Sequence, residues 1–322
     1  MEFKYRPTRR QMLGAAALLA ASPLLCAPES ESTTQPNEPI IDIHQHTNYS
    51  GRSDEQLLRH QKAMGVSYTL LLPAGTPVIR PSTLDGKANG LQASCGGFDT
   101  CIAIARAHPK EYGFYANEVP DLPDAAKTIA GQLKQGAIGI GEQKFHVDCD
   151  SPYIDGVAEV AKEFNVPVLM HFQQNTYNLN ILDFHKTLEK FPTVNFIGHA
   201  QTFWGYIDRG YKNTLDLYPK GGVTPGGLTD RLLSDYHNMW ADISAGSGLN
   251  ALTRDHKHAR EFLDRHQDKV MYGSDCNDRV GHGPVCQGWL TIRAIRELSN
   301  SKTIERKILY ENAKRLFKLK NI

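Results

Sequence analysis

Residues 40–46, IIDIHQH, decide how this chain folds. The apolar, β-branched start of the segment predicts a buried strand, and its end carries two histidines. Residues two apart on a strand point to the same face, so His44 and His46 project together from the strand terminus. Two imidazoles aimed at one point suit a divalent metal ion; the alternative is a pair of hydrogen-bonded core histidines. An open doubly wound sheet would carry a glycine-rich phosphate turn after this strand, where the chain has histidines instead.

Outward from this segment, seven more short apolar runs alternate with longer segments of helical period. Such alternation is typical of a parallel sheet with crossover helices. Eight strand and helix units between residues 40 and 322 predict an α/β fold of the closed (β/α)8 TIM-barrel type. The seven further strands are expected at 67–74, 112–119, 137–145, 166–172, 195–200, 239–245 and 270–276.

The segments between the predicted strands have the amphipathic pattern of surface helices. Ser53 is the expected N-cap of a helix over residues 53–65. A helix over residues 255–268 is expected to turn Phe262 and Leu263 inward and its charges outward. Six histidines in such segments are expected to be solvated or capping: His60, His108, His185, His256, His258 and His266.

Two connections are long for simple barrel loops, at residues 75–97 and 201–227. Both follow predicted strands. In a TIM barrel the loops after strands build the active-site mouth, so both are expected there.

Metal-ligating residue types recur at the ends of the predicted strands. His171 closes the fifth apolar run, His199 closes the sixth and Asp275 closes the eighth. With His44 and His46, they bring imidazole and carboxylate groups to the C-terminal face of the predicted barrel. The pattern predicts a metal-binding active site, because an arrangement without function would scatter these residues over helices and both faces.

The motifs Asp-x-His-x-His at 42–46, LMHF, FIGHA and YGSDC together resemble the amidohydrolase superfamily. With GIGEQKF at 139–145, they look like the "amidohydrolase 2" branch of metal-dependent hydrolases, which also contains decarboxylases. The resemblance implies a TIM barrel and a metal-activated water. Glu142 stands where related members carry a carboxylate that bridges two metals, or it is a hydrogen-bond partner of a histidine. Lys144, two residues on, is the alternative bridge, after carboxylation.

The resemblance also implies roles for two residues. Asp275 would bind metal, accept the proton of the attacking water and later deliver it to the leaving group. His199 would ligate a second metal or, with one metal, polarise the scissile carbonyl. The predicted cofactor is one or two divalent ions, with zinc first and manganese, iron or nickel as alternatives. The predicted metal ligands are His44, His46, Glu142, His171, His199 and Asp275.

Four residues are candidates for substrate contact. Gln173 shares the strand face of His171, and Gln201 and Trp204 follow His199. Trp204, like its neighbour Phe203, is equally well interpreted as a packing residue. His282 lies in the Gly-containing loop after the eighth strand, where it could orient or protonate a substrate.

Three functions remain in competition at this stage. The first is hydrolysis of an ester, lactone, amide or phosphoester bond of a small molecule. The second is a lyase, a one-metal decarboxylase of an aromatic or unsaturated acid from the same branch. The third is a periplasmic metal or ligand binder without catalysis. Glu142 favours the first, because a bridging carboxylate serves a two-metal hydrolase.

The overall charge gives no reason to expect nucleic acid as a partner, since the 36 basic side chains are balanced in number by 35 acidic ones. A hydrophobic content of 40% with 22% charged residues is typical of a globular protein with a sizeable core. The expected partner is a small-molecule substrate, and the oligomeric state cannot be predicted from one sequence.

Residues 1–27 resemble a signal peptide, since Arg9 and Arg10 precede an apolar run. The context resembles a twin-arginine signal with Met12 in place of the usual Phe, which predicts export to the periplasm. A permanent anchor is disfavoured because the run is shorter than the roughly 20 apolar residues of a span. A lipoprotein variant would use Cys26. Residues 28–39 are expected to be a flexible linker and residues 40–322 the barrel domain.

The six cysteines do not form a disulfide scaffold in a chain of this length, and they include no C-x-x-C pair. Cys95 with Cys101 and Cys276 with Cys286 are close enough in sequence for local bridges in an oxidising compartment. Free thiols are the alternative for each pair.

Overall fold

Eight parallel strands form the centre of the computed structural model, which describes residues 38–84 and 94–320. All eight predicted strands are confirmed, each shorter than its apolar run. Their bounds are β1 Ile41–Gln45, β2 Tyr68–Leu71, β3 Tyr112–Phe114, β4 Ile140–Gln143, β5 Val168–His171, β6 Phe196–His199, β7 Met239–Asp242 and β8 Val270–Met271.

The strands close into a ring through two seams. Continuous pairing gives the orders β1-β2-β3 and β4-β5-β6-β7-β8. An isolated parallel bridge between Ala116 and Ile140 joins β3 to β4. At the other seam, the Ile43 amide donates to the Tyr272 carbonyl at 3.2 Å and the Asp275 amide donates to the His44 carbonyl at 2.8 Å. The predicted (β/α)8 TIM barrel is therefore confirmed.

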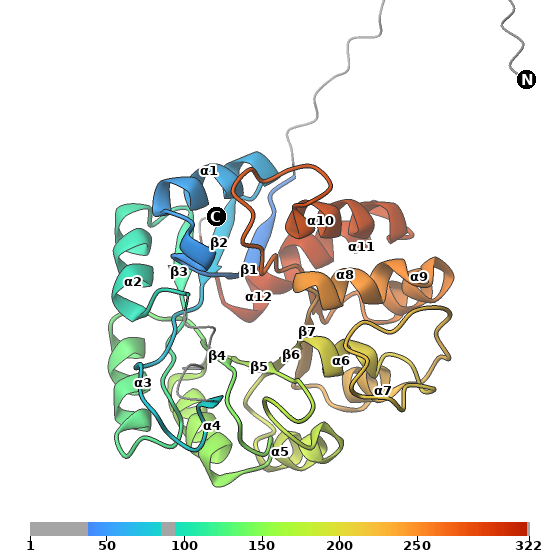
Figure 1. Ribbon diagram of the computed structural model, residues 1–322. Coiled ribbons are helices and arrows are strands. Elements are labelled where there is room, and N and C mark those ends of the chain that lie inside the picture. The colour runs from blue at the N-terminus through green and yellow to red at the C-terminus, as the bar shows by residue number, and fades with distance from the viewer. Residues whose placement is uncertain (1–37, 85–93, 321–322) are drawn as a thin grey trace, which may run out of the picture. The chain divides into compact units, whose positions relative to one another are not determined.

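Helices surround this ring: in Figure 1 the labels α1 to α11 lie outside those of the strands, and α12 lies across the centre. The expected cap is present, because Ser53 accepts from the Gln56 amide while the Gln56 side chain accepts from the Ser53 amide. The helical bounds are η1 Tyr49–Gly51, α1 Asp54–Met64, α2 Phe98–Ala107, α3 Ala125–Lys134, α4 Pro152–Phe164, η3 Ile181–Asp183, α5 Phe184–Lys190, α6 Gln201–Gly205, α7 Leu228–Asp235, α8 Ala245–Thr253, α9 His256–Arg265, α10 Gln287–Leu298, α11 Lys302–Arg306, the π-helix η4 Lys307–Glu311 and α12 Asn312–Leu316.

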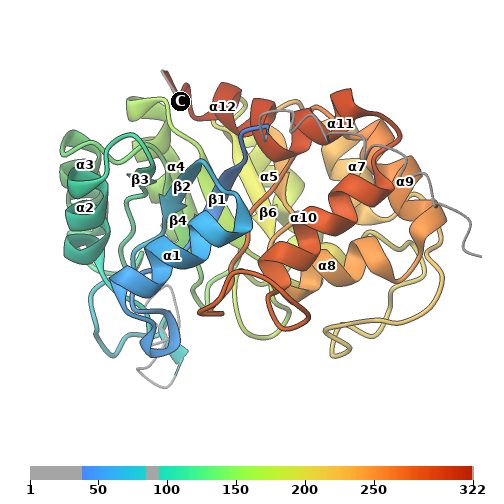
Figure 2. The same cartoon turned by 90° about the horizontal axis from the view of Figure 1, so that it is seen from above.

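Apolar side chains fill two separate layers. The larger cluster lies between the strands and the helices and includes Phe262 and Leu263 of α9, as predicted. The smaller cluster lines the barrel interior and continues into α12 and its C-cap Phe317. Figure 2 shows α12 at the upper edge and the loops that follow β6 and β8 at the lower edge. The C-terminal helix thus closes the end of the barrel opposite the loops after the strands.

A β-bulge in β1 separates the aspartate of the Asp-x-His-x-His motif from its histidines. The register between β1 and β2 shifts by one residue between Asp42 and Gln45. Asp42 consequently bonds to Gln61 of α1 at 2.8 Å and to the Ser274 amide at 2.8 Å. It anchors α1 and the segment after β8 and is not a member of the histidine cluster described below.

The helical histidines do not behave uniformly. His108, His185 and His256 are solvent-accessible, in line with the prediction. The prediction is wrong for His60 and His258, which are 0% and 3% exposed. His266 is 4% exposed but is the C-cap of α9, which is one of the two roles expected for it. His266 donates to Asp230 of α7, and His60 lies in a sulfur-containing cluster, so polar partners offset the cost of their burial.

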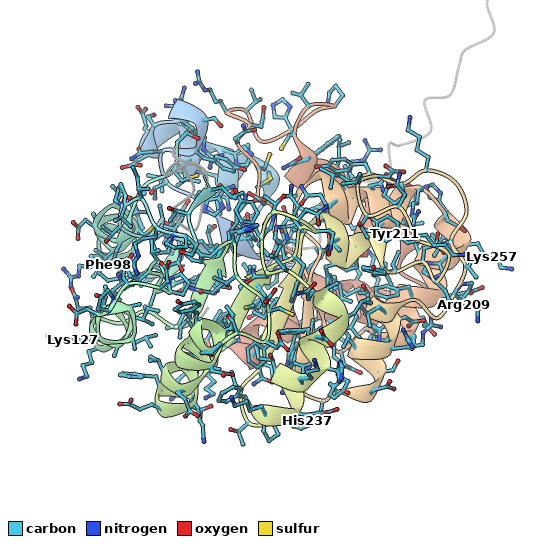
Figure 3. All side chains as sticks on the ribbon, turned by 60° about the horizontal axis from the view of Figure 1, so that its bottom comes forward. Phe98, Lys127, Arg209, Tyr211, His237 and Lys257 are labelled. Carbon is cyan, nitrogen blue, oxygen red and sulfur yellow. The ribbon has the colours of Figure 1, made fainter. Side chains whose placement is uncertain are left out.

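The outer surface carries the charged side chains. Figure 3 shows Lys127, Arg209 and Lys257 at the periphery of the molecule. No described helix combines the length and the apolarity that a membrane crossing requires. The predicted signal peptide 1–27 and all but the end of the linker 28–39 lie outside the described residues, so cleavage and export stay predictions.

Candidate metal centre

Four donor atoms from β1, β4 and the segments that directly follow β1 and β8 surround one point at the C-terminal end of the strands. His44 Nε2 and His46 Nε2 are 3.2 Å apart, and the Asp275 Oδ1 atom lies 3.8 Å from the first and 3.4 Å from the second. Glu142 Oε2 lies 3.7 Å from His44 Nε2 and 3.9 Å from His46 Nε2. Tetrahedral ligands at about 2.1 Å from an ion are about 3.4 Å apart, so this spacing fits one metal position.

A second group of donors lies on the other side of Glu142. Its Oε1 atom forms a hydrogen bond with His171 Nδ1 at 2.5 Å, so the alternative of a histidine partner is present, and it lies 3.5 Å from His199 Nε2. Asp275 Oδ2 lies 3.7 Å from the same His199 nitrogen. The two oxygens of Glu142, and those of Asp275, are thus divided between two sets of imidazoles. All six predicted ligands lie in this cluster.

Hydrogen bonds behind the imidazoles fix which nitrogen of each ring faces the cluster. His44 Nδ1 donates to Asp242 Oδ2 at 2.7 Å, and His46 Nδ1 donates to the Leu72 carbonyl at 3.0 Å. Ser244 Oγ donates to Asp242 and accepts from His199 Nδ1 at 2.9 Å. The Nε2 lone pairs of these three rings are therefore directed inward, as metal-ligating histidines require.

His171 is oriented the other way. Gln173 Oε1 lies 3.3 Å from His171 Nε2, while Nδ1 faces the Oε1 atom of Glu142 at 2.5 Å. Gln173, predicted as a substrate contact, therefore holds a ligand in place.

Two atoms of the cluster are buried without a hydrogen-bond partner among the described residues, His199 Nε2 and Asp275 Oδ1. Unsatisfied buried polar atoms are costly, and a cation between them would remove the cost. The side chain of Asp275 is 13% exposed, whereas those of the other five ligand candidates are 0–4% exposed. The residues present thus fit a divalent ion, and Asp275 is the member that solvent reaches.

The electrostatics of the cluster favour bound positive charge. Burial lowers the pKa of His44, but Asp275 and Asp242 outweigh it and raise that pKa well above its usual value. Burial, and then the charge of His44, lower the pKa of His199 to about 4. Burial raises the pKa of Glu142, yet the charges of His171 and Lys144 hold it well below its usual range. His199 is therefore neutral near pH 7, which is the metal-binding form of imidazole.

The backbone around the cluster is strained at three strand ends. Ala200 after β6, Ala245 after β7 and Asp275 after β8 have φ angles of 83°, 59° and 42°. Non-glycine residues rarely adopt this region, and such strain concentrates at functional sites. Glycine is required at Gly273, because a Cβ atom there would lie 2.4 Å from Asp242 Oδ1 and 2.8 Å from His44 Cβ.

Sequence reasoning missed two residues of the site, Asp242 and Ser244. Both belong to the seventh predicted strand, MWADISA, where only the fold was inferred. The available signal was the one used for the other strands, a polar residue at the end of an apolar run. Both side chains are 0% exposed, so they support the cluster from within the barrel wall.

The remaining substrate candidates differ in position. Gln201 Oε1 is buried without a partner among the described residues, and Gln201 Nε2 donates to the Tyr218 hydroxyl at 3.4 Å. For Trp204 the structure supports the packing alternative, since the residue is 2% exposed, packs on Phe262 and donates to the Asp242 carbonyl at 3.0 Å. Its large apolar ring is buried beneath the site. His282 is exposed and has no hydrogen bond or ion pair with another described residue.

Lys144, the alternative bridge, lies beside the cluster. Its Nζ atom is 5.4 Å from the centre of the Tyr177 ring. The position between the two sets of imidazoles is occupied by Glu142.

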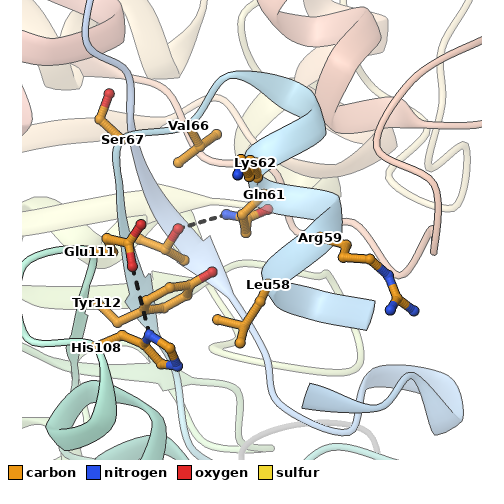
Figure 4. A pocket seen from close by; sticks show the side chains of 10 residues that line it. Leu58, Arg59, Gln61, Lys62, Val66, Ser67, His108, Glu111 and Tyr112 are labelled. Atoms are coloured by element: carbon orange, nitrogen blue, oxygen red, sulfur yellow. Dashed lines mark hydrogen bonds and ion pairs between the residues drawn. The ribbon is translucent and has the colours of Figure 1, made fainter. Parts of the chain in front are cut away.

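A surface pocket between α1 and the starts of β2 and β3 is separate from the metal-ligand cluster (Figure 4). It is lined by residues such as Thr69 and Tyr112 near the beginning of their strands, at the end of the barrel opposite the cluster.

A (β/α)8 barrel with imidazole and carboxylate donors at its strand ends has the architecture of an enzyme active site. The family model Amidohydro_2, described as amidohydrolase, matches residues 41–319, and the chain belongs to this family. Among curated proteins, none matches the chain.

Solved structures share the fold at low sequence identity. A putative 2-pyrone-4,6-dicarboxylic acid hydrolase from Pseudomonas putida is 16% identical, with 88% of this chain and 98% of that chain covered and a TM-score of 0.56. A 5-carboxyvanillate decarboxylase from Sphingomonas paucimobilis is 15% identical, with 88% of this chain and 99% of that chain covered and a TM-score of 0.54. A dihydroxybenzoic acid decarboxylase from Polaromonas sp. JS666, with bound manganese and an inhibitor, is 12% identical, with 88% of this chain and 98% of that chain covered and a TM-score of 0.53. At these identities the likeness concerns the fold.

Proposed function

We propose that this enzyme is a metal-dependent hydrolase that cleaves an ester, lactone, amide or phosphoester bond of a small molecule. The observation that carries the proposal is the division of Glu142 between two donor sets. Its Oε2 atom faces His44 and His46, and its Oε1 atom faces His171 and His199. A carboxylate shared in this way suits a two-metal hydrolytic centre.

Divalent ions held there would acidify a water molecule and polarise the bond to be cleaved. His44, His46 and Asp275 would hold the first ion, His171 and His199 the second, and Glu142 both. Imidazole and carboxylate donors suit zinc, and manganese is the alternative suggested by the decarboxylase of similar fold.

Asp275 is the residue that moves protons in this proposal. Its carboxylate is reached by solvent, and its Oδ1 atom has no hydrogen-bond partner among the described residues. Burial raises its pKa, but the charges of His44 and His46 hold it below its usual range, so the group is ionised near pH 7. An ionised carboxylate at this position can accept a proton from the attacking water and return it to the leaving group. Gln201, with its unpaired oxygen, is the proposed substrate contact.

Metal analysis of the purified protein, followed by screening of ester, lactone, amide, phosphoester and carboxylic acid panels, tests the proposal. We expect two ions per chain in wild type and one in Glu142→Gln, with hydrolytic turnover lost in that variant. Glu189→Gln, which changes an exposed glutamate of α5, is the matched control and should keep both ions. One ion per chain in wild type, with Glu142→Gln fully active, would contradict the two-metal proposal.

The second candidate is a one-metal decarboxylase of an aromatic acid. It is favoured by the solved decarboxylases of similar fold, one of which contains manganese. The donor atoms of His44, His46 and Asp275 lie within 4.8 Å of one another, so these three residues could hold a single ion. Release of carbon dioxide from the carboxylic acid panel, without hydrolysis of any other panel, would establish this reaction instead.

Export by a twin-arginine route is a separate proposal, supported only by the N-terminal sequence. Replacement of Arg9 and Arg10 by Lys should retain the protein in the cytoplasm. Continued accumulation of mature protein outside the cytoplasm would contradict it.

A further inference from the structure

A second cluster of metal-ligating side chains lies away from the barrel axis, between α1, α10 and the segment after β8. It consists of His60, Cys276 and Cys286, whose donor atoms all lie within 4.8 Å of one another. The three residues are 0%, 1% and 0% exposed. In Figures 1 and 2 the orange-red segment between β8 and α10 passes beside α1. None of these residues has a role in the function proposed above.

The spacing of the donor atoms is that of ligands around one ion. Cys276 Sγ and Cys286 Sγ are 3.8 Å apart, and Cys286 Sγ lies 3.5 Å from His60 Nε2. Zinc with sulfur at about 2.3 Å and nitrogen at about 2.1 Å in tetrahedral geometry separates two sulfurs by about 3.8 Å and sulfur from nitrogen by about 3.6 Å. A disulfide needs the sulfurs about 2.05 Å apart, and it would leave the histidine unexplained.

The histidine is oriented for this role. His60 Nδ1 donates to Gln61 Oε1 at 3.0 Å, so the Nε2 lone pair is directed at the two sulfurs. Gln61 in turn donates to Asp42 at 2.8 Å, which fixes the orientation from the barrel side.

Donors for a fourth position flank the cluster. Asp278 Oδ2 lies 3.9 Å from His60 Nε2, and Met64 Sδ lies 3.8 Å from Cys286 Sγ. Two thiolates, an imidazole and a carboxylate or thioether form a donor set that selects zinc over magnesium or calcium.

We propose that His60, Cys276 and Cys286 bind a structural zinc ion, separate from the candidate catalytic centre. Such an ion would join α1 to the start of α10 and to the segment that carries Asp275, the residue before Cys276. It would therefore fix the position of the Asp275 carboxylate, the proposed proton acceptor, relative to the strands of the barrel. The proposal does not depend on the reaction that the enzyme catalyses.

Cobalt(II) and zinc are the probes, added without oxygen to the full chain after reduction with a phosphine. With Co²⁺ we expect a thiolate-to-metal charge-transfer band in wild type that is lost in Cys276→Ser and in Cys286→Ser. Cys149→Ser, which changes a buried cysteine on the opposite side of the barrel, should keep the band. Cys95→Ser should keep it too. Cys95 is not a member of the His60, Cys276 and Cys286 cluster.

A second measurement needs no variant. X-ray absorption of the zinc-loaded wild type should show sulfur scatterers at about 2.3 Å from part of the bound zinc. Nitrogen and oxygen scatterers alone, in protein whose thiols are reduced, would overturn the proposal and leave the cysteines as a thiol pair. A band that persists in both cysteine variants, or that disappears in Cys95→Ser, would overturn it as well.

Discussion

The two ends of the barrel are built from the same eight strands and differ in what these strands bury. At the end closed by α12, Ile41, Ile197, Met271 and Phe317 belong to one buried apolar cluster. At the other end, the same strands β1, β6 and β8 lead to His44, His199 and Asp275. The apolar end contributes stability by excluding water, whereas the polar end holds uncompensated groups and strained backbone. Substitutions at the two ends should therefore affect different properties.

The largest effect on activity is expected for Asp275→Asn. Asparagine tolerates the positive φ of this position, so the fold is preserved while the proton acceptor is lost. We expect turnover on the substrate found by the panel screen to fall by roughly 10²- to 10⁴-fold. The thermal midpoint should change little. Asp268→Asn, an exposed aspartate before β8, is the control, and equal losses in the two variants would remove Asp275 from the mechanism.

Phe317→Ala should give the largest loss of stability. Phe317 is 5% exposed and its ring lies 5.6 Å from that of Tyr115 in the barrel interior. Removal of such a ring costs about 3–5 kcal/mol of unfolding free energy, measurable by urea denaturation. The activity of the folded fraction should be unchanged.

Leu182→Ala serves as the control for this variant, because Leu182 is 60% exposed and should lose little stability. A Phe317→Ala protein that is fully stable but inactive would show that the two ends are not separable.

Ser244→Ala should weaken metal binding without removing a ligand. The hydroxyl group accepts from His199 Nδ1 and donates to Asp242, so its loss frees the imidazole to rotate. Loss of such supporting bonds costs about 10- to 100-fold in metal affinity, which competition with a chelator can measure. Ser247→Ala is the matched control, since Ser247 is buried but its hydroxyl has no partner among the described residues. An unchanged affinity in Ser244→Ala would contradict this role.

The smallest effect is expected for Asp230→Asn, on the outer layer between α7 and α9. Burial raises the pKa of Asp230, but hydrogen bonds from His266 and Arg265 outweigh it and hold the pKa below its usual value. A lowered carboxyl pKa stabilises the fold above the usual value of about 4, and this contribution is lost as the pH falls toward the folded-state pKa.

Asp230→Asn should therefore cost about 1–2 kcal/mol at pH 7, and the difference from wild type should shrink below pH ~4. Thermal melts at several pH values measure this. Asp124→Asn, at an α3 N-cap whose side chain makes no capping bond, should show no such pH dependence. A pH-independent difference for Asp230→Asn would contradict the ionic origin of the effect.

Much of the fold could be predicted because its signals are local. The apolar runs and the intervening amphipathic segments specify strand and helix alternation, and Ser53 specifies a helix start. Residues two apart on one strand share a face, so His44 and His46 could be paired without knowledge of the rest of the molecule. His171, His199 and Asp275 followed from the barrel rule that strand ends meet at one face.

Only the tertiary structure decided what depends on register and on packing between distant segments. The bulge in β1 directs Asp42 away from the histidines, and burial removes Trp204 from the mouth of the site. Asp242 and Ser244 became members of the site because β7 lies beside β6. The fold also brings His60 next to Cys276 and Cys286, which are more than 200 positions away in the sequence. Local patterns fix which face a side chain takes, while closure of the ring fixes its neighbours, because those contacts join residues that the sequence separates.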